Sequence, residues 1–311
     1  MERSAQRGNY CFVCLVFPFN WLAEQRDSLT LLAFGMAVLF VLGGVATTFA
    51  PPVITPVTIR LADVPEGMPH GGIRIALLSD IHIGPTVGKA RIEEIVKMTN
   101  ELEPDVVAIS GDLADGFLLN LEEAAQPLCQ LTPKHGIYFA TGNHEYMHGN
   151  VDEWFAFLRG CGIVVLHNEN RRIPLPENAT LCMAGADDIT AAKSNFPGHA
   201  MDAAKAVKGC LPSDVVVLLA HQPNAAAKVL KAPEGKLTDL ILSGHTHAGQ
   251  MYFFAPVVYL ANAFTRGLYK DRFTDTYIYV SAGVNYFGPP VKMFGTCEII
   301  DITLVPLPAV Q

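Results

Sequence analysis

The fold is decided by the stretch IRIALLSDIH, residues 73–82. Its first six residues are apolar except for Arg74. A short apolar run of this kind predicts a buried β-strand. Ser79, Asp80 and His82 follow the run directly, so we expect the strand to end at side chains that can bind a metal ion or move a proton.

The same pattern recurs along the chain. Further strands are predicted at residues 106–109, 137–140, 215–219 and 240–242, with a β-rich end at 277–280 and 297–304. Helical periodicity predicts helices at residues 89–101, 151–159 and 222–230. Strands that alternate with helices indicate an α/β fold.

Polar side chains follow each of the five central strands. The candidate ligands are Asp80, His82, Asp112, Asn143, His221, His245 and His247. In open α/β sheets, ligands bind beyond the carboxyl ends of the strands. Any one of these residues alone is more often an ordinary hydrogen-bonded side chain, but their recurrence at five strand ends favours a shared site. Gly111, Gly142 and Gly244 stand among them and permit close backbone approach.

The net charge of the chain and the chemistry of the candidate ligands indicate which partners the protein can bind. The chain has 22 basic and 30 acidic residues, a net charge of −8, and no basic run, which argues against a nucleic acid partner. An acidic chain that handles a phosphorylated substrate needs local positive charge, and metal ions can supply it. The mixture of carboxylate, amide and imidazole groups indicates Mn²⁺, Fe or Zn²⁺ rather than Mg²⁺.

Read in order, the motifs are D-x-H, G-D-x-x-D, G-N-H-E, a single His and G-H-x-H, and this set resembles the signature of the calcineurin-like metallophosphoesterase superfamily, in its membrane-associated branch. The resemblance implies a layered fold with central mixed β-sheets flanked by helices. It also implies two divalent metal ions and hydrolysis of a phosphate monoester, diester or pyrophosphate by a hydroxide that bridges them. By resemblance, the first metal has Asp80, His82 and His247 as ligands, the second has Asn143, His221 and His245, and Asp112 bridges both.

Three further residues are assigned to catalysis. The resemblance implies that His144 faces the phosphate and the leaving oxygen as a general acid. Glu145 is expected to orient His144, because a carboxylate commonly fixes a histidine tautomer. Asp115 is expected to hold a ligand or a backbone turn, although an exposed loop aspartate is the alternative.

The N-terminal part predicts a membrane protein. Residues 29–50 carry no charge and are long enough to span a bilayer as a helix; a cleaved signal peptide, a buried helix and a hairpin with a short apolar segment at 10–23 are the alternatives. Arg3, Arg7 and Arg26 precede the span, which favours a single pass with the main domain on the non-cytoplasmic side. The predicted organisation is an N-terminal segment at 1–28, a transmembrane helix at 29–50, a proline-containing linker at 51–70 and a metallophosphoesterase domain at 71–305.

The sequence leaves the substrate open between a phosphorylated small molecule and a lipid, and it predicts no oligomeric state. Seven scattered cysteines do not decide the compartment. The alternative function is a catalytically inactive, membrane-anchored binding or scaffold protein that retains the fold. All seven ligand positions are filled, which disfavours this alternative.

Overall fold

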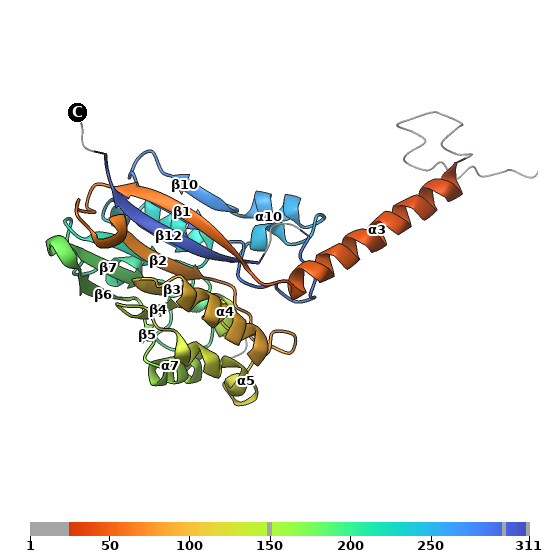
Figure 1. Ribbon diagram of the computed structural model, residues 1–311, viewed down its shortest axis with the longest axis horizontal. Coiled ribbons are helices and arrows are strands. Elements are labelled where there is room, and N and C mark those ends of the chain that lie inside the picture. Colours follow the sequence, from red (N-terminus) through yellow and green to blue (C-terminus); the bar gives the residue numbers. More distant parts are fainter. Residues whose placement is uncertain (1–24, 148–150, 294–296, 309–311) are drawn as a thin grey trace, which may run out of the picture. The chain divides into compact units, whose positions relative to one another are not determined.

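The computed structural model describes residues 25–147, 151–293 and 297–308 (Figure 1). The chain divides into two units, Met1–Gly43 and Gly44–Gln311. The possible membrane segment at 10–23 lies outside the described residues.

One long helix, α3 (Arg26–Phe49), begins the described chain. Its 24 residues correspond to a length of about 36 Å, which exceeds the roughly 30 Å of a hydrocarbon core. Nearly all of its side chains are exposed, and its length and composition qualify it to cross a membrane. The helix agrees with the span expected at 29–50 and begins three residues earlier.

The second unit contains two six-stranded mixed sheets. The first has the order β1-β12-β2-β3-β4-β5, and all its neighbours are parallel except β12 and β2. Its strands are β1 (Val53–Leu61), β2 (Ile73–Leu78), β3 (Val106–Ser110), β4 (Ile137–Ala140), β5 (Val164–Val165) and β12 (Glu298–Pro306).

The second sheet has the order β10-β11-β9-β8-β7-β6, and its four central strands are parallel. Its strands are β6 (Glu169–Pro174), β7 (Thr180–Gly185), β8 (Val215–Leu219), β9 (Leu240–Ser243), β10 (Gly267–Lys270) and β11 (Tyr277–Val280). The helices of this unit are α4 (Lys89–Glu101), α5 (Leu118–Ala125), α6 (His144–Met147), α7 (Val151–Gly160), α8 (Ala203–Ala206), α9 (Pro223–Leu230) and α10 (Ala255–Ala261).

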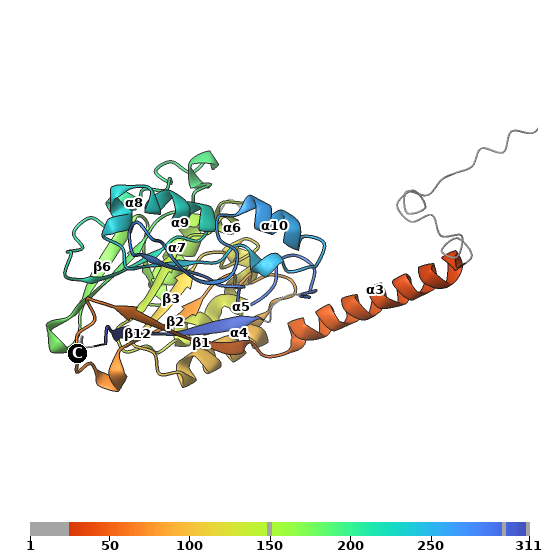
Figure 2. The ribbon, with the colours of Figure 1, turned by 90° about the horizontal axis from the view of Figure 1, so that it is seen from above.

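The two sheets pack face to face between layers of helices (Figure 2). Strand β2 illustrates this packing, because it is covered on both faces. Ile73, Ile75 and Leu77 lie in the core between the sheets, while Ala76 and Leu78 lie in the core under α4 and α7. Successive strand residues point to opposite faces, so a strand that is covered on both faces reads as a continuous apolar run. This arrangement confirms the predicted α/β fold with mixed sheets flanked by helices.

The expected linker at 51–70 is wrong for much of its length. Residues Val53–Leu61 form β1, which pairs in parallel with β12 from Val53 opposite Glu298 to Leu61 opposite Pro306. Prolines at 51, 52 and 56 suggested a linker, but β1 is an edge strand, where a proline needs no hydrogen-bonding neighbour on its free side. The folded domain therefore includes residues before 71, with the last strand ending at Pro306.

Candidate metal centre

Five parallel strands deliver the candidate ligands to one place. Strands β2, β3 and β4 of the first sheet lead into the loops that carry Asp80 and His82, Asp112, and Asn143. Strands β8 and β9 of the second sheet lead into His221 and into His245 and His247.

Hydrogen bonds between the two sheets hold these strand ends together. The hydroxyl of Ser110, at the end of β3, donates to the carbonyl of Leu242 in β9 at 2.9 Å. The backbone N–H of His245 donates to Oδ1 of Asp80 at 2.9 Å. Buried polar groups need such partners, so these bonds fix the separation of the loops from the two sheets.

The first group of ligand atoms comes from Asp80, His82 and His247, all buried. Nε2 of His82 lies 3.1 Å from Nε2 of His247. Nε2 of His247 lies 3.3 Å from Oδ1 of Asp80. Two imidazole nitrogens and a carboxylate oxygen that face one point form a donor set suited to a divalent transition metal.

The second group comes from Asp112, His221 and His245. Nε2 of His221 lies 3.0 Å from Oδ2 of Asp112. The amide oxygen of Asn143 is buried and has no hydrogen-bond partner among the described residues. Buried polar atoms without partners are costly unless a ligand satisfies them, so these residues fit a second metal ion.

Asp112 faces both groups. Its Oδ2 lies 3.0 Å from Nε2 of His221 and 3.9 Å from Nε2 of His82. Burial raises the pKa of the Asp112 carboxyl, but the imidazoles of His221, His82 and His144 together outweigh burial and hold that pKa below its ordinary value. The carboxylate therefore stays ionised between the two groups, which suits a bridging ligand.

The second ring nitrogens of His221 and His82 have hydrogen-bond partners. Nδ1 of His221 donates to the carbonyl oxygen of Ser110 at 2.7 Å, so the lone pair of Nε2 can bind a metal ion. Nδ1 of His82 lies 2.8 Å from Oδ1 of Asp115. Such partners fix the tautomer and the ring orientation of a metal-binding histidine.

His144 lies at the edge of the same centre. Its Nε2 is 3.9 Å from Oδ2 of Asp112, and its Nδ1 is 2.7 Å from Oδ1 of Asp115. One oxygen of Asp115 thus contacts the imidazoles of both His82 and His144. These contacts allow Asp115 to orient both imidazoles. Asp115 is therefore not the exposed loop aspartate that the sequence left as the alternative.

Glu145 has other contacts than those expected. Its carboxylate accepts the backbone N–H groups of Asp112, Leu113 and Gly142 at 2.6–3.1 Å. Burial, together with the charge of Asp112, raises the pKa of Glu145 to about 7. The expectation that Glu145 orients His144 is therefore corrected: Asp115 contacts the His144 ring, and Glu145 holds the backbone of the two ligand loops.

The ligand loops adopt uncommon backbone conformations. Five of the seven candidate ligands, namely Asp80, His82, Asp112, His245 and His247, have φ between 47° and 71°. Residues other than glycine rarely adopt this left-handed region, and such strain clusters at functional sites. Gly244 is required for a different reason, because a Cβ at this position would overlap Ser79 and Asp80.

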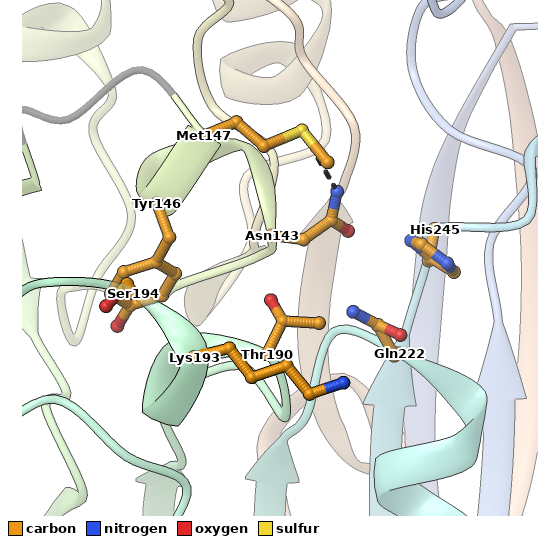
Figure 3. Close-up of a pocket in the computed structure, with 8 residues that line it drawn as sticks. All are labelled: Asn143, Tyr146, Met147, Thr190, Lys193, Ser194, Gln222 and His245. Carbon is orange, nitrogen blue, oxygen red and sulfur yellow. Dashed lines mark hydrogen bonds between the residues drawn. The ribbon is translucent and has the colours of Figure 1, made fainter.

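A polar pocket opens beside the second group, and the sequence did not predict it. Its volume is about 330 Å³, and it reaches Asn143 and His245. Tyr146, Met147, Thr190, Lys193, Ser194 and Gln222 complete its lining, and Figure 3 shows Lys193 extending into it. The segment that carries Thr190 and Lys193 has no recognisable motif, so only its position in the fold reveals it.

A separate group of His167, Asp187 and His199 also lies close together. Nδ1 of His199 is 3.2 Å from the hydroxyl of Tyr146, which lines the polar pocket. The sequence assigned no function to His167 and His199. His148, which closely follows the G-N-H-E motif and is a further candidate for the pocket by sequence, lies outside the described residues.

Comparison with known proteins identifies a family and several relatives of this chain. The sequence model of the calcineurin-like phosphoesterase family matches residues 73–249. The chain is 55% identical over 286 residues to the metallophosphoesterase-family protein F40B5.2 of Caenorhabditis elegans, covering 92% of this chain and 59% of the relative. It is 42% identical over 277 residues to the Danio rerio transmembrane protein with metallophosphoesterase domain, covering 88% of this chain and 62% of the relative. Among solved structures, a dimetal phosphatase from Danio rerio aligns with a TM-score of 0.45 at 12% identity, covering 71% of this chain and 90% of that chain.

The fold and the clustered candidate ligands support a phosphoesterase-type hydrolase and suggest divalent metals. The chain belongs to the calcineurin-like phosphoesterase family. Its transmembrane relatives and the apolar helix α3 support membrane localisation. The chain spans about three fifths of the length of these curated relatives, 59% and 62%.

Proposed function

We propose that the protein is a membrane-anchored binuclear metallohydrolase that cleaves a phosphate ester or anhydride of a small molecule or a lipid. One observation carries the proposal: Oδ2 of Asp112 faces ligand atoms of both metal-binding groups. A single carboxylate oxygen between two groups of imidazoles suits two adjacent cations better than one.

The ligand set decides which metals fit. It combines four imidazoles with two carboxylates and one amide oxygen, a mixture that suits Mn, Fe or Zn. When bound, two such ions supply a nucleophilic water of lowered pKa and neutralise the phosphoryl oxygens.

The protein's own groups manage the proton and the substrate. Hydrolysis forms a bond from the water oxygen to phosphorus and breaks the bond from phosphorus to the leaving oxygen. In this proposal His144 gives its Nε2 proton to that leaving oxygen, and the contact of Asp115 with Nδ1 supports this role by holding the ring. Lys193 adds positive charge in the polar pocket, where the remainder of an anionic substrate would bind.

We further propose that the catalytic unit lies on the non-cytoplasmic side of the membrane. Two disulfide bonds, Cys129–Cys161 and Cys182–Cys210, lie within it. Disulfides persist in oxidising compartments and are rare in the cytosol. They support the orientation that Arg3, Arg7 and Arg26 suggest.

The decisive experiment removes the bridging carboxylate from the full-length protein in detergent. We expect Asp112→Ala to lower metal content at both sites and abolish turnover of a chromogenic phosphodiester, because a bridging carboxylate offsets the repulsion between two cations. Asp275→Ala, which removes an exposed carboxylate paired with Lys270, is the matched control and should keep both metals. An Asp112→Ala protein with two bound metals and normal turnover would show that the proposal is wrong.

A further inference from the structure

A second cavity opens at the metal centre, and no catalytic role uses it. It has a volume of about 550 Å³, within the range of sites that hold small ligands. His245 and His247 form one part of its wall, and Met251, Phe254 and Phe287 contribute apolar surface. A molecule held by the metals therefore has an apolar space directly beside it.

The cavity continues into an exposed apolar surface. Residues 251–265 contain no charged side chain, and helix α10, within this segment, has no buried residue. Phe253, Tyr259 and Leu260 are 65%, 63% and 89% exposed. Apolar and aromatic side chains gathered on one exposed segment are typical of a surface that contacts another apolar phase.

Hydrogen bonds connect this surface to the end of the membrane helix. The backbone N–H of Lys292 donates to the carbonyl of Gly44 in α3 at 2.9 Å, and the Thr47 hydroxyl donates to the carbonyl of Lys292 at 2.5 Å. The next residue, Met293, donates its N–H to the carbonyl of Gln250 at 2.7 Å. Gln250 directly precedes the uncharged segment. The apolar phase available to this segment is therefore the bilayer that α3 enters.

The geometry points to a lipid-chain site: the apolar cavity binds an acyl chain of a lipid phosphate, and α10 lies in the headgroup region of the membrane. This inference rests on the proposed phosphoesterase function, because the metals hold the phosphate of the same molecule. The acyl chain leaves the bilayer along the apolar face of residues 251–265 and stays out of water until it reaches the cavity. The hydrolytic step is the one already described, with water as the only co-reactant.

The first test measures the dependence of hydrolysis on chain length. Full-length protein in nanodiscs is given alkyl nitrophenyl phosphodiesters from ethyl to decyl, each below its micelle-forming concentration. We expect kcat/KM to rise by up to about fourfold per methylene until the cavity is filled. Val257→Asp, at a residue that lines the cavity, should bring the decyl-to-ethyl ratio close to one. Leu119→Asp, at an 88% exposed leucine of α5, should leave the ratio as in the wild type.

The second test measures the position of α10 without any turnover. Tryptophan is introduced at Leu260 or, as the matched control, at Leu119, and full-length protein is reconstituted with nitroxide-labelled lipids. We expect the fluorescence of Leu260→Trp to be quenched and that added by Leu119→Trp to be unaffected. Equal quenching of the two, or none, would overturn the membrane contact.

The two tests separate the possible failures. A wild-type protein that hydrolyses ethyl and decyl esters equally well would overturn the lipid-chain site and leave the phosphoesterase function intact. A metal-loaded protein that hydrolyses no ester would overturn the proposed function and with it the lipid substrate, while the quenching result would still decide whether α10 contacts the bilayer.

Discussion

Lys292 offers a sharp test of how the loop behind the metal centre is held. Its side chain is completely buried. Nζ donates to the carbonyl oxygens of Ala282, Gly283 and Asn285 at 2.6, 3.2 and 2.8 Å. Lys292→Met keeps most of the length of the side chain and removes the charge and all three donors, so it isolates the contribution of the ammonium group.

The magnitude follows from two opposing effects. Hydrogen bonds to a charged group contribute about 1.5–3 kcal/mol each, so the loss of three corresponds to about 5–9 kcal/mol. Removing a buried ammonium also removes a desolvation cost of several kcal/mol, and the same burial lowers the pKa of Lys292. The net expectation is a free energy of unfolding lower by about 2–4 kcal/mol.

We expect Lys292→Met to affect the two metal-binding groups unequally. Gly283 lies so close to the first group that a Cβ there would be 2.9 Å from Cβ of Asp80 and 3.2 Å from Nδ1 of His247. Loosening this loop should therefore weaken the first metal and retain the second, which unfolding in urea and metal analysis would show. Lys97→Met, at a lysine with a 76% exposed side chain, is the control and should change the free energy by less than about 0.5 kcal/mol. Unchanged stability and full metal content in Lys292→Met would refute the reasoning.

Three other substitutions probe separate parts of the chain. His144→Gln should keep two metals yet lower kcat by about 10²–10⁴-fold, with a smaller loss for a nitrophenyl ester than for an alkyl ester, since an activated leaving group needs little protonation; equal losses with chemistry limiting the rate would contradict the acid role. Asp115→Asn should reduce metal affinity or kcat/KM by about 10–100-fold, measured by metal titration and steady-state kinetics, because it weakens the orientation of both His82 and His144. Burial raises the pKa of Asp239 to about 6, so its protonated form stabilises the fold below about pH 4 and this contribution is lost as the pH rises through 6. Asp239→Asn should then raise the free energy of unfolding at pH 7.5 by at most about 3 kcal/mol relative to the wild type and leave it unchanged at pH 4, as urea unfolding at the two pH values would reveal.

Several features of the fold could be predicted from local sequence patterns. The strands expected at 73–78, 137–140 and 215–219 and the helix at 89–101 have the observed bounds. Their signals are local, because a strand covered on both faces needs a continuous apolar run and a half-buried helix needs apolar residues at helical spacing. Strands β6 and β10 carry no such run, since both are edge strands with exposed residues, and they were not predicted.

The residues of the candidate site could be predicted from the sequence, but the contacts between them could not. The sequence supplied all seven candidate ligands, since each follows an apolar strand in a recognisable motif. It assigned the orientation of His144 to the adjacent Glu145, whereas the contact comes from Asp115, 29 positions earlier in the chain. Neighbours in sequence point in different directions in a tight turn, so a side-chain partner depends on how the loops meet.

The amino-acid sequence by itself determined the order of strands and ligands, the metal chemistry that the ligands favour and the long apolar helix, because each depends on residues that lie close together in the chain. Only the tertiary structure decided that β1 belongs to the sheet, that Asp112 faces both ligand groups, and that buried Lys292 supports the loop beside Asp80. It also decided that Gln250, which precedes an uncharged segment, is hydrogen-bonded to Met293, next to the residue that is bonded to Gly44 of α3. These features depend on pairing, burial and hydrogen bonds between residues up to about two hundred and fifty positions apart, as in the bond from Lys292 to Gly44, and no local pattern records which distant segments will meet.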